Sequence, residues 1–338
     1  MIRRLGAVAF AVLAAACGGA PQSPLNPVGA EAREVLTLGA IYTALAVLTY
    51  VLVNTVLVLG LRRRRRTVLP EVPEVAPAEA DERRLGRKVR NAAIVTALIL
   101  AVYVGATWAV EAHVTSSPAT RPITIQVTGR QWWWEMRYQD SVPSQTFITA
   151  NELHVPVGRP VVMLLQSEDV IHSFWVPALN GKKDLVPGKT NRVVFTPREA
   201  GTFRGQCAEF CGFQHAHMAF DVVVESQDAF DAWVAAQRTP APPPDDSLAA
   251  RGQQVFLSKA CPTCHAIQGA RAFGSRGPDL THVASRQSLA AGTLPNTRGH
   301  LAGWIVDPGR QKPGTRMPPN PMSGEELEAL LAYLEGLK

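Results

Sequence analysis

Two long uncharged runs open the chain, and much shorter apolar runs follow them. Residues 35–61 carry no charged side chain over 27 positions, and residues 92–110 form a second uncharged run of 19 positions. A helix that spans a membrane needs about 20 predominantly apolar residues. The pattern therefore predicts two transmembrane helices, which form a helical hairpin over residues 31–111.

Basic residues are concentrated between these two runs. Ten of them occur there, in Arg62–Arg66 and then at Arg83, Arg84, Arg87, Lys88 and Arg90. Because such residues accumulate in cytoplasmic loops, the loop is predicted to be cytoplasmic and everything after Glu111 to lie outside. These residues also supply much of the formal net charge of +6, so the charge does not indicate a nucleic-acid partner.

The first residues have the pattern of a secretory signal. Two arginines precede a short apolar run, and small residues lead up to Cys17. The run is too short for a spanning helix, so residues 1–16 are predicted to be a signal peptide. The small residues before Cys17 resemble a bacterial lipoprotein cleavage box, which predicts lipidation of Cys17. An ordinary signal peptide or a retained anchor is the alternative.

From residue 121 the sequence pattern is typical of a β domain. Turn residues separate short β-rich runs, which predict strands at Ile123–Val127, Trp132–Tyr138, Val161–Gln166, Arg192–Phe195 and Phe220–Val224. A helix at 226–237 closes this domain, which is expected to be a β-sandwich or barrel over residues 121–237. The proline-rich residues 239–246 are a stiff linker by composition. A further domain follows over residues 247–338.

Sulfur and imidazole donors are concentrated near the end of the β domain. Cys207 and Cys211 are followed by His215 and Met218, and His172 offers another imidazole upstream. Soft sulfur ligands with imidazole suit copper and, less selectively, zinc. The thioether favours copper, and five donors exceed what one tetrahedral ion needs. Sulfurs spaced in this way could bridge a pair of copper ions, with a zinc or disulfide site as the alternative.

The last domain carries the attachment motif of haem c. Cys261 and Cys264 are spaced to form thioethers with the haem, and His265 follows as the proximal iron ligand. The sequence around Met317 resembles that of the axial Met in class I cytochromes c, with Met322 as the alternative. His/Met ligation raises the haem potential. The resemblance implies an all-α domain.

The segment from Cys207 to Met218 resembles the CuA site of cytochrome c oxidase subunit II, and the resemblance covers about residues 30–237. It implies a cupredoxin-like fold and a binuclear copper centre. The implied ligands are the side chains of His172, Cys207, Cys211, His215 and Met218 and the backbone carbonyl of Glu209. In this family the Glu side chain also reaches a magnesium ion shared with subunit I. The expected fold class is a mixed multidomain membrane protein, with a two-helix transmembrane hairpin, a cupredoxin-like β-sandwich and an all-α class I cytochrome c domain.

Three consecutive tryptophans precede this site, at Trp132, Trp133 and Trp134. In the family the first Trp of such a cluster lies exposed above the copper site and admits electrons from cytochrome c. The resemblance assigns this role to Trp132. Core packing or a membrane-interface position is expected for Trp133 and Trp134, and core packing is the alternative for Trp132.

Together these features predict subunit II of cytochrome-c oxidase with a fused cytochrome c. Electrons would pass from its haem c to CuA and then to subunit I, where O2 is reduced to water with proton translocation. The expected partners are subunit I, subunit III, an upstream cytochrome or reductase complex as donor, and membrane lipid. The expected location is the bacterial inner membrane, with two spans and both redox domains on the periplasmic side.

Three other functions are alternatives to this one. The electron-accepting subunit of a CuA-containing nitric oxide reductase fits the same residues and stays open. A membrane-anchored copper carrier has no use for a haem relay. A quinol oxidase subunit lacks the copper ligands, which are all present here.

Overall fold

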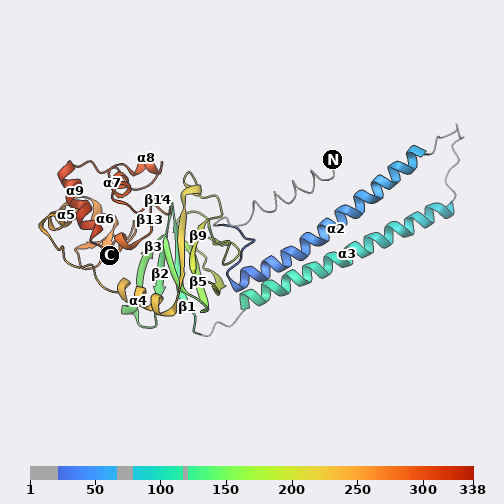
Figure 1. Cartoon of the computed structure of the whole chain (residues 1–338), viewed down its shortest axis with the longest axis horizontal. Helices are drawn as coiled ribbons and strands as arrows, with labels where there is room; N and C mark the ends of the chain where they lie inside the picture. The colour runs from blue at the N-terminus through green and yellow to red at the C-terminus, as the bar shows by residue number, and fades with distance from the viewer. Residues whose placement is uncertain (1–21, 67–78, 117–120) are drawn as a thin grey trace, which may run out of the picture. The chain divides into compact units, whose positions relative to one another are not determined.

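The structure is a computed structural model that describes residues 22–66, 79–116 and 121–338 (Figure 1). It divides into two compact units, one formed by Glu34–Ser117 and the other by the chain on either side of that segment. The predicted signal peptide and Cys17 lie outside the described residues, as do residues 67–78 between the two apolar runs.

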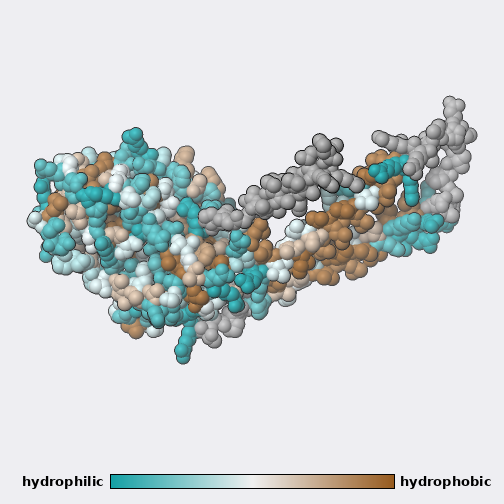
Figure 2. All heavy atoms as spheres, viewed as in Figure 1, coloured by the Kyte–Doolittle hydropathy of each residue, from teal (hydrophilic) through white to brown (hydrophobic). Residues whose placement is uncertain are grey.

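Two long helices form the unit of residues 34–117. They are α2 (Ala30–Arg66) and α3 (Glu79–Ser116), and both are long and apolar enough to cross a membrane. Their apolar side chains are exposed along most of their length (Figure 2). Within this unit the ring centroids of Tyr42 and Tyr103 lie 4.8 Å apart, so the two helices pack side by side. Two such helices agree with the predicted hairpin.

A sandwich of two five-stranded sheets forms the β domain. One sheet has the order β3-β2-β1-β5-β8 and the other the order β4-β10-β9-β6-β7. The strands are β1 (Ile123–Arg130), β2 (Trp133–Gln139), β3 (Phe147–Ala150), β4 (Glu152–Pro156), β5 (Val161–Ser167), β6 (His172–Trp175), β7 (Lys183–Leu185), β8 (Asn191–Phe195), β9 (Gly201–Cys207) and β10 (Ala219–Glu225). Helix α4 (Gln227–Gln237) follows, with the Ser226 side chain capping its N-terminus.

Large aromatic side chains fill the space between the two sheets. Trp134, Phe174 and Phe220 are fully buried, and the rings of Trp134 and Phe220 meet edge to face with their centroids 5.3 Å apart. Burying a side chain of Phe size stabilises a fold by about 1.5–3 kcal/mol. The ring of His172 lies 6.1 Å from that of Trp134, so this core directly supports one of the predicted metal ligands.

All five predicted strands are present, but five others were missed. The missed strands are β3, β4, β6, β7 and β9. β7 has three residues and β3 and β6 have four, and β9 has the polar sequence Gly-Thr-Phe-Arg-Gly-Gln-Cys. Such strands form because their neighbours supply the backbone partners, and this information is absent from local sequence. The second predicted strand was placed one residue too early, since β2 begins at Trp133 and ends at Gln139, and Trp132 lies in the preceding turn.

Five helices build the C-terminal domain, as the predicted fold class requires. They are α5 (Ser247–Ser258), α6 (Cys261–Cys264), α7 (Arg298–Val306), α8 (Pro308–Gln311) and α9 (Gly324–Glu335). Four two-residue strands, β11 (Ala266–Ile267), β12 (Ala272–Phe273), β13 (Ser288–Leu289) and β14 (Leu294–Pro295), form two small ladders in the loops. The three-part fold class is thus confirmed, whereas the exact domain limits stay predictions.

Residues 239–246 do not run free of the C-terminal domain. The backbone N–H of Ala241 donates to the carbonyl of Gln268 over 2.9 Å, and Ala241 packs against the core of that domain. At the end of the linker the Asp246 carboxylate caps α5 by accepting from the N–H of Ala249 over 2.7 Å. The linker therefore joins its two domains through specific contacts.

The close crossing of α5 and α9 generates a stability prediction. A Cβ at Gly252 would lie 1.9 Å from the backbone oxygen of Ala329, so Gly252→Ala should force the two helices apart. Overpacking of this kind costs typically about 1–3 kcal/mol. Denaturant titration followed by far-ultraviolet circular dichroism should show this loss in the transition of the C-terminal domain.

The matched control is Gly299→Ala in α7, where an added Cβ would meet no atom within 4 Å. This change should leave the stability unaltered or raise it by up to about 1 kcal/mol, because Ala is the better helix former. Equal midpoints for the two variants would contradict the close crossing.

Candidate metal centre

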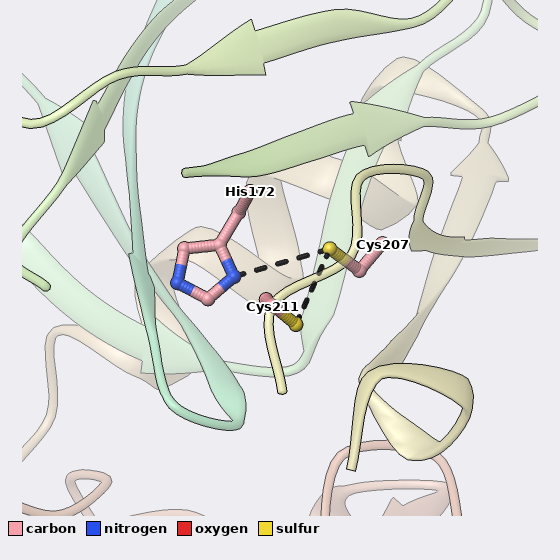
Figure 3. A group of neighbouring side chains, drawn as sticks. All are labelled: His172, Cys207 and Cys211. Carbon is pink, nitrogen blue, oxygen red and sulfur yellow. Dashed lines mark hydrogen bonds between the residues drawn. The ribbon is translucent and has the colours of Figure 1, made fainter. Parts of the chain in front are cut away.

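Three potential ligands meet at one end of the β-sandwich. The donor atoms of His172, Cys207 and Cys211 all lie within 4.8 Å of one another, and all three residues are buried. The Sγ of Cys207 lies 3.9 Å from Nδ1 of His172 and 3.8 Å from Sγ of Cys211 (Figure 3). Neither thiol is in a disulfide, so the disulfide alternative is not realised.

The remaining predicted donors surround the same two sulfurs. Nδ1 of His215 lies 3.6 Å from Sγ of Cys211, and Sδ of Met218 lies 3.9 Å from it. The backbone oxygen of Glu209 lies 3.2 Å from Sγ of Cys207. All the donors named from the sequence therefore converge. Two thiols, two imidazoles and a thioether in a buried site fit copper better than structural zinc, which takes four ligands and rarely a thioether.

Strand pairing explains why residues 35 positions apart meet here. Strand β9 lies between β6 and β10 in its sheet, and Phe174 of β6 is paired with Cys207 of β9. The N–H of Cys207 donates to the carbonyl of Met218 over 2.9 Å, which closes the base of the loop between β9 and β10. The sheet thus fixes both ends of the ligand loop and the start of the strand that carries His172.

The two thiols cannot be treated as independent acids. A hydrogen bond from Cys211, assisted by His172, lowers the pKa of Cys207 to about 3, whereas the same pairing raises the pKa of Cys211. The pair therefore holds one negative charge readily and a second only with difficulty. A bound cation would remove this conflict, because metal binding favours the deprotonated form of both thiols.

Asp169 is a residue of the site that was not predicted. Its Oδ1 lies 2.8 Å from Nε2 of His172, so the imidazole presents Nδ1 to the sulfurs. Burial acts to raise the pKa of Asp169, but hydrogen bonds from His172 and from the backbone N–H of Gln131 and Val170 outweigh it and lower the pKa. A carboxylate three positions before a candidate ligand was the available signal, since such partners orient metal-binding imidazoles.

The residues of the haem motif are arranged around α6. Nδ1 of His265 lies 2.7 Å from the carbonyl oxygen of Pro278, so Nδ1 donates, and in the neutral ring Nε2 carries no proton. Burial lowers the pKa of His265, which favours the neutral imidazole. A Cβ at Gly277 would lie 2.7 Å from the ring of His265, so this close approach requires glycine.

The two methionines considered as second haem ligand have different surroundings. Met322 packs against the core of the C-terminal domain, whereas Met317 is half-buried and lies outside that cluster. His282 is buried with Nδ1 2.8 Å from the Lys338 carbonyl, and His300 is exposed next to Thr297. Neither histidine lies in the haem-binding motif.

Trp132 lies directly against the ligand loop. Its indole Nε1 donates to the carbonyl of Cys211 over 2.9 Å, and a Cβ at Gly212 would come within 3.0 Å of its ring. Gly212 has a φ of 112°, a value that glycine adopts easily. Trp134 is fully buried, as expected of a core residue, and Trp133 is half-buried with the Arg130 guanidinium 5.3 Å from its ring centroid.

The fold and the two motifs define a class of protein, namely a cupredoxin-like metal domain joined to a c-type cytochrome domain. Residues 141–227 match the family described as cytochrome C oxidase subunit II, periplasmic domain, and residues 249–338 match the cytochrome c family. These two segments match the families of cytochrome c oxidase subunit II and of cytochrome c, so the resemblance seen in the sequence is confirmed.

Named relatives agree with this assignment. Cytochrome c oxidase subunit 2 of Alkalihalophilus pseudofirmus is 42% identical over 217 residues, which is 64% of this chain and 61% of the relative. The protein of the same name from Bacillus sp. (strain PS3) is 36% identical over 228 residues, which is 64% of this chain and 62% of the relative. The chain thus spans about three fifths of the length of these relatives.

A solved structure also matches part of the chain. The periplasmic domain of subunit II of cytochrome oxidase of Bradyrhizobium japonicum aligns with a TM-score of 0.33 and 32% identity, over 36% of this chain and 95% of that one.

The contact between Asp169 and His172 generates a prediction for metal binding. Asp169→Asn keeps the shape but removes the negative charge that orients the imidazole, so metal affinity should fall by about 10–100-fold. Competition with a chelator of known affinity measures this loss. Asp140→Asn is the matched control, because Asp140 is exposed and pairs with Arg238 away from the site. An Asp169→Asn protein that binds copper as tightly as the control would exclude this role.

Proposed function

We propose that this chain is the electron-accepting subunit of a haem–copper terminal oxidase, cytochrome-c oxidase. Electrons pass from a covalently bound haem c to a binuclear CuA centre and then to subunit I, where O2 is reduced to water with proton translocation. The observation that carries the proposal is the convergence of five side-chain donors around Cys207 and Cys211, in the same compact unit as the haem motif.

In this proposal CuA is held by residues from β6, β9 and the loop after β9. They are the side chains of His172, Cys207, Cys211, His215 and Met218 and the backbone carbonyl of Glu209. Bound copper supplies a one-electron carrier. The protein holds four of these side chains almost without solvent exposure and fixes both ends of the ligand loop by strand pairing, so the donors need little rearrangement. The half-buried Glu209 side chain is proposed to reach a magnesium ion shared with subunit I.

The haem is proposed to be attached through Cys261 and Cys264, with His265 and Met317 as axial ligands. The Nδ1 contact of His265 with the Pro278 carbonyl supports this, because it orients the ring and leaves Nε2 for iron. Met317 is favoured over Met322, since Met322 is already packed against the domain core.

Trp132 is proposed as the port through which CuA receives electrons. Its hydrogen bond to the Cys211 carbonyl couples the indole to the copper loop. On its other side, a Cβ at Gly314 would lie 3.6 Å from the Trp132 ring, and Gly314 precedes Met317 by three residues. The indole thus lies between the proposed copper ligands and the proposed haem ligand loop.

The membrane location and partners are part of the same proposal. Helices α2 and α3 are proposed to cross the bacterial inner membrane, with the redox domains of residues 121–237 and 247–338 on the periplasmic side. Subunit I is the proposed acceptor, and subunit III is a further expected neighbour. An upstream cytochrome or reductase complex is the proposed donor. Lipidation of Cys17 stays a prediction.

The function is tested by following both centres after the haem alone is reduced. A photoactivated one-electron donor should reduce the haem of the intact chain, and the haem band should then decay while the near-infrared copper band changes on the same time course. Cys207→Ser should keep the haem spectrum and abolish the copper step, because one of the two sulfurs that would hold copper is lost. Haem reoxidation at equal rates in both proteins would contradict the proposal.

The port assignment is tested by Trp132→Ala. If Trp132 carries electrons, both optical spectra should persist while transfer from haem to copper slows by orders of magnitude. If it is only a core residue, truncation should instead cost roughly 3–5 kcal/mol of stability and lead to copper loss. Melting temperature and flash-induced transfer, measured on the same protein, separate the two accounts. Trp133→Ala serves as control and should transfer at the unmodified rate.

A further inference from the structure

The C-terminal domain contacts the β domain through two of its loops. One loop contains residues 287–293, which include β13, and the other contains residues 312–316. The hydrogen bonds of the first loop are Gln287 N to Glu152 Oε2 (2.8 Å), Ser288 Oγ to Asp221 Oδ2 (2.8 Å), Ala219 N to Ala291 O (3.0 Å), Arg204 to Gly292 O (3.2 Å) and Thr293 Oγ1 to His217 O (3.3 Å). Both domains contribute donors and acceptors, so these hydrogen bonds define one relative position of the two domains.

Lys312 lies at the centre of the second loop's contact. Its side chain is buried, with a residue exposure of 2%, and its Nζ donates to the carbonyl oxygens of Trp132 (2.8 Å), His217 (2.7 Å) and Ala290 (3.0 Å). An ammonium group has three N–H donors, and all three are used. Two of the acceptors belong to the β domain, and the third belongs to the C-terminal domain.

A buried ammonium makes this contact selective for one arrangement. Burial lowers the pKa of Lys312 to about 7, which measures how strongly the surroundings oppose the charge. Each carbonyl that accepts from Nζ favours the charged form and offsets part of this cost. If the domains shifted, the ammonium would lose acceptors and stay desolvated, which is expensive. The observed docking satisfies all three donors.

The acceptors of Lys312 lie next to the proposed electron path. One is the backbone oxygen of Trp132, whose indole donates to the Cys211 carbonyl. Another is His217, which directly precedes Met218 in the copper loop. Gly314, two residues beyond Lys312, faces the Trp132 ring. Nearby, Gln214 Nε2 donates to the Pro313 carbonyl over 2.9 Å. The lysine therefore fixes the loop before Met317 against the Trp132 indole.

We propose that the two redox domains form a fixed docking surface with Lys312 as its positioning residue, and that electrons cross from the haem to the copper centre in this docked arrangement. The inference rests on the proposed function and deepens it, because it specifies a permanently docked donor. The alternative is a haem domain that swings on its linker and meets the copper domain transiently.

Lys312→Met in the intact chain with both cofactors tests the proposal. Methionine fills similar space but donates no hydrogen bond, so three buried carbonyls lose their partner. Transfer from haem to copper should slow by about tenfold or more, as expected when the docked fraction drops to a minority. Transfer should also become slower with added viscogen, since diffusion of the domain then limits it. A purely structural lysine would not produce this viscosity dependence.

Lys259→Met is the matched control. Lys259 also belongs to the C-terminal domain, and its Nζ pairs with Glu326 of the same domain at 3.2 Å. This variant and the unmodified chain should transfer electrons at the same rate at every viscosity. A viscosity-dependent rate in the unmodified chain, or an unchanged rate in Lys312→Met, would overturn the fixed docking surface and leave the proposed function standing. If the unmodified chain transfers no electrons from haem to copper, the proposed function itself fails.

A second variant decides the matter if Lys312→Met loses copper or haem. Ser288→Asp places a carboxylate opposite Asp221, at a part of the docking surface that contains no proposed ligand. Repulsion of like charges should undock the domains while both spectra persist. Slower, viscosity-dependent transfer supports the fixed surface, and an unchanged rate refutes it.

Discussion

The thiols of Cys207 and Cys211 lie 3.8 Å apart in a buried site, and the rest of the site depends on this constraint. Two thiolates at this distance repel each other, and burial removes the water that would screen them. In the folded protein the pKa of Cys207 is therefore lowered and the pKa of Cys211 is raised. A bound metal ion would let both sulfurs ionise, so the buried thiol pair favours a metal site.

The surrounding scaffold limits how far this pair can relax. Cys207 ends strand β9, whose neighbours β6 and β10 hold it from both sides. The rings of Trp134, Phe174 and Phe220 pack beneath it in a close-packed core. Asp169 then orients His172 from outside the ligand set. Core packing and strand pairing therefore keep the two sulfurs close together despite their repulsion, so the site is pre-organised.

The features that could be predicted from the sequence are those that depend on local residue patterns. The uncharged runs gave α2 and α3, and the spacing of Cys207, Cys211, His215 and Met218 gave donors that the structure brings together. Short strands such as β7 carry too few residues for a pattern, because their partners lie elsewhere in the chain. The ligand role of Met317 and the electron-port role of Trp132 remain predictions from resemblance.

Long-range contacts were the least predictable part of the site. Asp169 had a local signal in its spacing from His172, whereas Lys312 had none. Lys312 lies 180 residues after Trp132 and 95 after His217, and by composition a lysine in a loop is expected on the surface. Its burial arises only because two domains meet over it. Such a residue becomes visible when the tertiary contacts of both domains are known together.

The covered face of the C-terminal domain has a consequence for the direction of electron flow. A freely diffusing cytochrome uses one exposed haem edge twice, first with its reductant and then with its oxidant, because it dissociates in between. Here the loop of residues 312–316 lies against Trp132 and the loop that carries the proposed copper ligands. In the proposed arrangement, the haem edge next to this loop would face the copper centre. An incoming donor would then approach another side of the haem. The fused cytochrome domain would then accept electrons at one surface and donate them at another, whereas a diffusing cytochrome uses a single surface for both.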